Sequence, residues 1–284
     1  MQSVVVTGVS TGIGWGALKV LSSKGIHVFG SVRKSEDAER LAAEFGDSFT
    51  PLIFDVTDEE SIGEAAEQVR KQINSHNLLG LVNNAGIAIG GPLMHQPIAD
   101  FRKQIEVNLI GQLIVTQAFL PLLGTDSNFQ GKPGRIINVS SVGGKIASPF
   151  LGAYSASKFG LEAFSEALRR ELTIYGIDVI IIGPGSVVTP IWDKAEKMDF
   201  SQYENTKFAS SSKKFLDYAL EKGRSGYSVE AVGELIWKTL RVAKPRVRYP
   251  IVPNHFFDWT IARLLPKRVL DNIIASQFGL KTEQ

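Results

Sequence analysis

A tyrosine and a lysine four residues apart carry the chemistry that this sequence indicates most strongly. In a helix, Tyr154 and Lys158 share one face, with Cβ atoms about 5–6 Å apart. A phenol titrates near pH ~10 in water, so it is a poor acid or base at neutrality. An ammonium group one turn away favours the phenolate and lowers that pKa. Lowering it to ~7 requires about 4 kcal/mol, which is more than one lysine supplies, so we expect a second positive charge nearby to supply the rest.

The surrounding residues distinguish this pair from two similar spacings. Tyr203 and Tyr218 are also followed by a lysine four residues later, so the spacing alone has little weight. Tyr154, in contrast, follows an apolar run at 135–139, two serines and a Gly-Gly pair. The hydroxyl of Ser141, at the end of that run, is expected to hold a substrate oxygen beside the phenol.

Length and composition describe an ordinary globular protein. The chain has 284 residues, 44% of them hydrophobic and 21% charged, and its net charge of +2 gives no electrostatic case for a nucleic-acid partner. Cysteine is absent, which excludes disulfides and thiolate metal sites. The four histidines lack ligand spacing, so no metal site is expected.

The N-terminus is typical of a first strand rather than a signal peptide. No run of about 20 apolar residues occurs, so the sequence predicts no membrane span. The cytoplasm is the default location.

Apolar runs rich in β-branched residues alternate with helical patterns, which predicts βαβ units and a parallel sheet. We expect one α/β domain, a doubly wound parallel sheet of seven strands with helices on both faces. The expected strands are 3–7, 27–31, 50–54, 78–82, 135–139, 178–182 and 248–252. The expected helices are 13–23, 36–45, 58–74, 98–123, 154–175 and 228–243.

The first strand leads directly into a glycine-rich turn. Glycines let the backbone approach a pyrophosphate closely, and the helix that follows offers free N–H groups and its dipole. The residues that we assign to this cofactor site are Gly8, Ser10, Thr11, Gly12, Ile13 and Gly14.

Two positions bear on which dinucleotide binds. The second strand ends near Arg33, with no carboxylate before Glu36. A carboxylate here accepts a hydrogen bond from the ribose 2′-hydroxyl of NAD, whereas a guanidinium suits the 2′-phosphate of NADP. NADP(H) is therefore favoured over NAD(H), with a solvated basic turn as the alternative for Arg33. Asp55, after the third strand, is expected to accept from the adenine amine.

Two asparagines have two interpretations each. Asn83 ends the fourth strand, where it either contacts the cofactor or braces the sheet. Asn108 is polar within an otherwise apolar helix, which is unfavourable by propensity. It therefore either satisfies backbone groups or serves the site.

Together these motifs resemble the short-chain dehydrogenase/reductase family over about residues 1–190, and in particular its NADP-using retinol and 17β-hydroxysteroid dehydrogenase-like members. The resemblance implies a Rossmann-like fold. It makes Tyr154 the general acid/base, Lys158 the group that lowers its pKa and holds the nicotinamide ribose, and Ser141 the group that orients the substrate oxygen. It also implies that Asn108 holds a proton-relaying water. It adds to the cofactor site Val56, Asn83, Ala85, Gly86, Pro184, Gly185, Val187 and Thr189.

The segment 186–227 suits either a lid over a hydrophobic substrate or ordinary helix packing, and Trp192 is the residue expected to contact the substrate. The segment carries the large apolar and aromatic residues on which this interpretation rests, namely Ile191, Trp192, Met198, Phe200, Tyr203, Phe208, Phe215 and Tyr218. Two apolar helical patterns, 256–265 and 269–275, are split by Pro266. They are expected to cover the cleft, pack on a second subunit or contact a membrane surface. We therefore divide the chain into a catalytic domain over 1–250 and a helical extension over 251–284.

These features predict an oxidoreductase that uses NADP(H) to interconvert a hydrophobic alcohol and its ketone or aldehyde, of retinoid, steroid or lipid type. The alternative is a non-catalytic NADP(H)-binding redox sensor, which the intact set of Ser141, Tyr154 and Lys158 disfavours. By analogy with the family, the helices over 98–123 and 154–175 are expected to form a homodimer or homotetramer.

Overall fold

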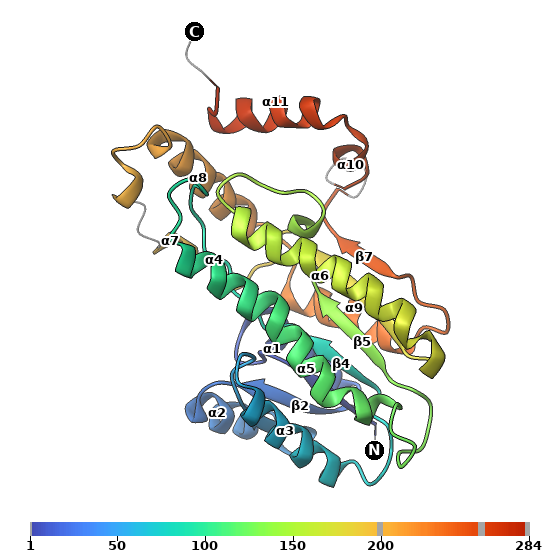
Figure 1. The fold of residues 1–284 in the computed structure, drawn as a ribbon. Coiled ribbons are helices and arrows are strands. Elements are labelled where there is room, and N and C mark those ends of the chain that lie inside the picture. The colour runs from blue at the N-terminus through green and yellow to red at the C-terminus, as the bar shows by residue number, and fades with distance from the viewer. Residues whose placement is uncertain (1, 198–200, 255–258, 282–284) are drawn as a thin grey trace.

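A computed structural model describes residues 2–197, 201–254 and 259–281. Its parallel strands form one seven-stranded sheet in the order β3-β2-β1-β4-β5-β6-β7, with helices on both faces (Figure 1). The strands are β1 (Ser3–Val6), β2 (His27–Val32), β3 (Phe49–Ile53), β4 (Gly80–Asn83), β5 (Arg135–Val139), β6 (Asp178–Pro184) and β7 (Arg248–Ile251). The predicted doubly wound α/β architecture is therefore confirmed.

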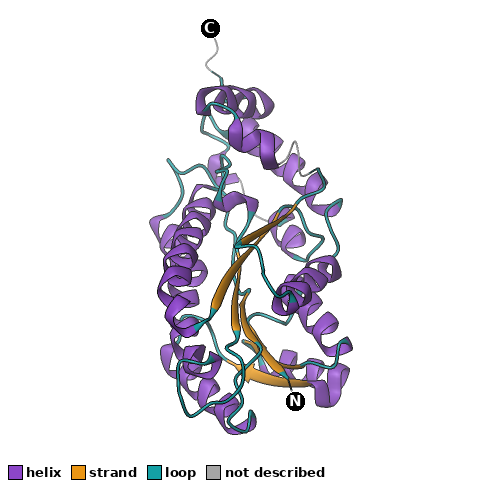
Figure 2. Cartoon of the chain, turned by 90° about the vertical axis from the view of Figure 1, so that its right-hand side faces the viewer, coloured by secondary structure: helices purple, strands orange, loops and turns teal. Residues whose placement is uncertain are grey.

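Helices lie on both sides of the sheet (Figure 2), and each face has its own hydrophobic core. Along β1, Val4 and Val6 face one core and Val5 faces the other, as the alternation of side chains in a strand requires. Because both faces are covered, the strands are nearly continuous apolar runs. One core is covered by α1 (Gly12–Ser23), α2 (Ser35–Phe45) and α9 (Val229–Arg241). The other is covered by α3 (Glu59–Gln72), α5 (Gly111–Phe119) and α6 (Gly152–Glu171).

The helix expected over 98–123 is interrupted. The structure has α4 (Ile98–Ile105), a π-helical turn over Glu106–Ile110, then α5 and a 3₁₀ turn over Leu120–Leu123. A π turn adds one residue to the helical repeat and often marks a functional site. Here it contains Asn108, one of the predicted site residues.

The same segment, Ile98–Leu123, is long and apolar enough to cross a membrane by length and composition alone, since its most apolar 18-residue stretch has a mean hydropathy of 1.4. Core helices of soluble proteins pass the same test, so this is weak evidence. Three of its buried polar side chains bond the loop after β4: Gln104, Asn108 and Gln112. The absence of a membrane span stays a prediction.

A third, aromatic cluster joins the predicted lid to the C-terminal extension. The rings of Phe150, Phe215 and Phe278 are buried together, and the centroids of Phe215 and Phe278 lie 5.4 Å apart. The cluster joins α8 (Ala209–Arg224) to α11 (Lys267–Phe278), both of which lie above the sheet in the view of Figure 1. The short helices α7 (Ile191–Glu196) and α10 (Ala262–Leu264) belong to the same two segments of the chain. Met198, Phe200 and the first part of the predicted 256–265 helix lie outside the described residues. The division at residue 250 stays a prediction.

Candidate active site

A cavity of about 470 Å³ opens where the loops after β1 to β6 converge. It lies beside the point between β1 and β4 at which the strand order reverses, where open α/β sheets bind their ligands. Many of the predicted site residues line it: Gly8, Ser10, Thr11, Gly12, Ile13, Arg33, Asp55, Val56, Ala85, Gly86, Tyr154, Lys158 and Thr189.

The turn after β1 has a backbone that only glycine adopts cheaply. Gly8 and Gly12 have φ values of +70° and +64°, in the left-handed region. A Cβ on Gly14 would collide with the Gly8 carbonyl, so Gly14 packs the start of α1 against the turn and does not line the cavity. The first N–H groups of a helix have no intrahelical partner. This donor set and the absence of Cβ atoms fit the pyrophosphate of a dinucleotide.

Arg33 and Asp55 face the same part of the cavity. Nη1 of Arg33 lies 3.8 Å from Oδ2 of Asp55, and the Arg33 side chain is 71% exposed, so its guanidinium is accessible to a ligand. Oδ1 of Asp55 accepts from the backbone N–H and the hydroxyl of Thr57, at 3.1 and 2.8 Å. A further cation, Arg40, donates to the Ser10 carbonyl at 2.9 Å, which the sequence did not indicate.

Asn83 braces the sheet, so its assignment to the cofactor site is wrong for the side chain. Nδ2 donates to Thr116 Oγ1 and Asn138 Oδ1, both at 2.9 Å, in a buried environment. The neighbouring Asn84 lines the cavity instead, and its Nδ2 donates to the carbonyls of Thr7 and Gly8. The two side chains diverge because successive residues of a strand point to opposite faces.

Asn108 satisfies backbone groups, which was one of its two predicted roles. Nδ2 donates to the Ile87 carbonyl at 2.8 Å and to Ser157 Oγ at 3.0 Å, and Oδ1 accepts from the Ile87 N–H at 2.8 Å. The side chain therefore ties the π turn to the loop after β4 and to α6. The water-holding role stays a prediction.

Ser141, Tyr154 and Lys158 come together from two elements. Ser141 caps the short 3₁₀ turn after β5, with its Oγ accepting from the Gly143 N–H at 3.0 Å, and its side chain also hydrogen-bonds Tyr154. Tyr154 and Lys158 lie on α6, with Nζ of Lys158 5.9 Å from the centroid of the phenol ring. That Nζ donates to the Val139 carbonyl at 2.9 Å.

Burial shifts the pKa values of Tyr154 and Lys158 in opposite directions. It raises the pKa of Tyr154, against a hydrogen bond from Ser141 that lowers it. Burial also lowers the pKa of Lys158 to about 8, and the nearby charge of Glu162 opposes that shift. The prediction that the lysine lowers the pKa of the phenol is therefore wrong for the protein alone. Burial removes the phenolate from water, and this raises the pKa by more than the neighbouring groups lower it.

The segment after β6 lines the cavity through fewer residues than predicted. Pro184 ends β6, Gly185 donates to the Ile251 carbonyl, and neither they nor Val187 line the cavity. The indole N–H of Trp192 donates to the Val187 carbonyl at 2.7 Å, and its ring packs against Gly223 on α8. Trp192 does not line the cavity and its ring fastens the lid segment to α8, so its contact with the substrate stays a prediction.

Other lining residues were not predicted, among them Ser31, Asn84, Lys103, Glu106 and Ser140. Ser31 accepts from the Gly8 N–H at 2.9 Å and so supports the glycine turn. Asn84 and Ser140 are sequence neighbours of predicted residues, and Glu106 lies in the π turn. For Lys103 the sequence offers no comparable signal.

A nucleotide-sized cavity at the switch point, with a phenol, a hydroxyl and an ammonium at one end, defines a dinucleotide-binding oxidoreductase. Residues 2–199 match the family model described as short chain dehydrogenase. The chain belongs to the short-chain dehydrogenase family, as the motifs predicted, and is an NAD(P)-dependent oxidoreductase.

Individual relatives agree with this family. The chain is 39% identical over 285 residues to the NADPH-dependent 3-dehydrocapnine reductase of Ornithobacterium rhinotracheale, covering 100% of both chains. It is 35% identical over 262 residues to retinol dehydrogenase 16 of Mus musculus, covering 87% of this chain and 79% of that one. A crystal structure of a short-chain dehydrogenase from Streptomyces avermitilis shares the fold, with a TM-score of 0.76 and 23% identity over 99% of this chain and 98% of that one.

Proposed function

We propose that this protein is an NADPH-dependent reductase of a hydrophobic ketone or aldehyde. One observation carries the proposal: the phenol of Tyr154 lines the dinucleotide cavity while hydrogen-bonded to Ser141 and one helical turn from Lys158. A proton donor, a second hydroxyl bonded to it and a cation thus lie close together at the cavity. Reduction of a carbonyl needs a proton at its oxygen, and this arrangement provides one.

The mechanism assigns one task to each side chain. NADPH, when bound, would supply the hydride that the carbonyl carbon accepts. Tyr154 donates its proton to the carbonyl oxygen, and the Ser141 hydroxyl donates a hydrogen bond to the same oxygen and holds it beside the phenol. The positive charge of Lys158 favours the phenolate that remains, and Lys158 would also hold the nicotinamide ribose. The raised pKa of Tyr154 keeps the phenol protonated at neutrality, as a proton donor requires.

The choice of NADPH rests on Arg33, and a relative that is named NADPH-dependent supports it. Arg33 is the exposed guanidinium at the cavity. The variant Arg33→Ala is expected to weaken NADPH binding by about tenfold or more, since a hydrogen bond to a charged group is worth about 1.5–3 kcal/mol. NADH binding should change by less than about twofold.

Tryptophan fluorescence titration with NADPH and NADH measures both constants. The neighbouring Lys34→Ala is the control for loss of positive charge alone. Equal losses for NADPH and NADH in Arg33→Ala would contradict the assignment of Arg33 to the 2′-phosphate.

The hydrophobic class of substrate is supported by the names of two relatives, a 3-dehydrocapnine reductase and a retinol dehydrogenase. The test is NADPH oxidation with 3-dehydrocapnine, retinal and a short water-soluble ketone. We expect a kcat/KM at least about a hundredfold higher for one of the two lipophilic carbonyls than for the short ketone, because each buried CH₂ contributes about 0.8 kcal/mol. Preference for the short ketone would contradict the proposal.

A further inference from the structure

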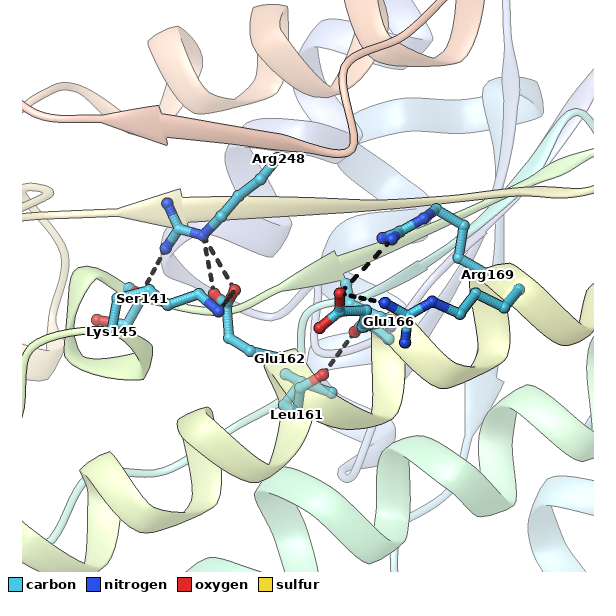
Figure 3. Close-up of polar contacts among 10 residues, drawn as sticks. Ser141, Lys145, Leu161, Glu162, Glu166, Arg169 and Arg248 are labelled. Atoms are coloured by element: carbon cyan, nitrogen blue, oxygen red, sulfur yellow. Dashed lines mark hydrogen bonds and ion pairs between the residues drawn. The ribbon is translucent and has the colours of Figure 1, made fainter.

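Arg248, the first residue of β7, reaches the backbone of Ser141 from the far side of β6. Its Nη2 donates to the Ser141 carbonyl at 3.0 Å, and its Nε donates to both oxygens of Glu162, at 3.0 and 3.1 Å (Figure 3). Arg248 thereby ties the turn after β5 to α6. β6 leaves room for this, because any Cβ on Gly183 would collide with the guanidinium.

This ion pair is buried. The side chains of Arg248 and Glu162 are 11% and 3% exposed, and Nζ of Lys145 lies 3.3 Å from the second carboxylate oxygen. A buried ion pair seldom stabilises a fold more than apolar residues of the same volume would, since both charges must leave water. Stability alone therefore does not explain the pair, whereas its hydrogen bond to Ser141 gives it a second role.

The C-terminal extension covers the guanidinium. The indole ring of Trp259 lies 4.1 Å from Cζ of Arg248, and Arg263 lies 4.7 Å from the same ring. Trp259 is 6% exposed. Such stacking restricts the guanidinium plane and shields its charge from water.

The Glu162 carboxylate also acts on Lys158. Glu162 lies one helical turn after Lys158 on α6, and its charge opposes the lowering of the lysine pKa by burial. Contacts therefore run from Tyr154 through Ser141 to Arg248. From Arg248 they continue to Glu162, which lies on the same helix, α6, as Lys158.

We propose that Arg248 and Glu162 are positioning residues for the reaction, with Arg248 fixing the turn that carries Ser141 and Trp259 holding Arg248 in place. This inference rests on the proposed function, in which Ser141 holds the substrate oxygen. The C-terminal extension is then part of the support of the active site.

The main test needs no ligand. In Arg248→Lys, the charge stays but the ammonium lacks the planar fork that reaches Glu162 and Ser141 together. Hydrogen exchange of the unliganded enzyme, followed by mass spectrometry, should then accelerate by about tenfold or more in the peptide spanning 140–146. The amides of Gly144, Lys145 and Ile146 are hydrogen-bonded within this turn.

In the same variant, the kcat for NADPH-dependent reduction of 3-dehydrocapnine should fall by about tenfold or more, with the KM for NADPH changed by less than about twofold.

Arg135→Lys is the matched control. Arg135 is a half-buried arginine at the opposite end of the same sheet, with its Nε 3.3 Å from Asp178 and its Nη1 donating to the Thr239 carbonyl at 2.7 Å. Arg135→Lys should lower the midpoint of urea unfolding and leave amide hydrogen exchange in the peptide 140–146 unchanged. If Arg248→Lys did the same, the inference would be overturned.

A second pair of variants keeps the test decisive if Arg248→Lys does not fold. Trp259→Phe preserves a flat ring over the guanidinium and should leave exchange at 140–146 close to that of the wild type, whereas Trp259→Leu should accelerate it. Equal exchange in both would contradict the role of Trp259. Tyr154→Phe separates the two proposals: if it retained kcat, the proposed function would fail, while the exchange results would still decide the role of Arg248.

Discussion

Lys158 is the residue through which pH should act on the site. Its pKa is lowered to about 8 by burial against the opposing charge of Glu162, whereas that of Tyr154 is raised. The lysine therefore loses its proton before the phenol does. Arg248 and Lys145 are the other charges beside Glu162. The cation that would hold the ribose is thus present at neutrality and lost above about pH 8.

NADPH binding should accordingly weaken as pH rises through about 8 and keep falling for one to two units. In Lys158→Met the affinity should be lower at neutrality, and this dependence should disappear. Fluorescence titrations with NADPH between pH 6.5 and 9.5 measure the effect, and the Kd is expected to change by roughly tenfold over this range. A wild-type affinity that is constant across this range would contradict the assignment.

Loss of the fold does not explain such a change. The unfolded chain binds more protons at Lys158 than the folded chain does between about pH 8 and 10.5, so this residue makes folding more favourable as pH rises across that window. Urea unfolding at both ends of the pH range separates the two effects.

At the same scale, the sequence predicted residues whose roles depend on local spacing. Tyr154, Lys158 and the turn from Gly8 to Gly14 are of this kind, since helix geometry and a glycine backbone are local properties. Asn83 could not be settled, because only the direction of its side chain decides between cofactor and sheet. The sign of the Tyr154 shift was missed because burial depends on the whole fold.

At the scale of elements, the bracing asparagine makes a clear prediction. Asn83→Ala removes hydrogen bonds to Thr116 and Asn138 and should lower the free energy of unfolding by about 1–3 kcal/mol, because buried groups lose their partners. NADPH affinity should change little. Urea unfolding and fluorescence titration measure the two quantities.

Asn84→Ala is the adjacent control. It removes bonds to the carbonyls of Thr7 and Gly8 at the cavity, so it should weaken NADPH binding more than Asn83→Ala does. The reverse order of the two variants would show that the structural assignment of Asn83 is wrong.

The elements themselves were predicted unevenly. β5 has the predicted limits, and the order of strands and helices follows the apolar periodicity. The π turn over Glu106–Ile110 was missed because its extra residue is fixed by the bonds of Asn108 across the molecule. Arg248 and Glu162 are 86 positions apart in the sequence, so a local spacing pattern cannot predict their contact.

At the scale of the whole molecule, exposed apolar residues on the π turn before α5, on α5 itself and on α6 bear on assembly. Ile110, Leu113 and Phe159 are 40%, 38% and 42% exposed. We propose that these helices meet a second copy of the chain, as was expected for the long helices. Light scattering should give a dimer or tetramer for the wild type, and Leu113→Asp should shift it towards monomer, since an unpaired charge in an interface is costly.

Leu264→Asp is the control at a distant surface, since Leu264 is 75% exposed on α10. It should leave the mass unchanged. A monomeric wild type, or a Leu113→Asp variant with the wild-type mass, would contradict the proposed interface.

The central claim is that Tyr154 transfers the proton in an NADPH-dependent reduction, and Tyr154→Phe tests it most directly. The variant removes only the hydroxyl, so fluorescence titration should give an NADPH Kd within about twofold of the wild type. Single-turnover oxidation of bound NADPH by the preferred carbonyl substrate should slow by about 10²–10⁴-fold, the usual contribution of a positioned proton donor. A variant that bound NADPH normally and still reduced the substrate at the wild-type rate would contradict the account.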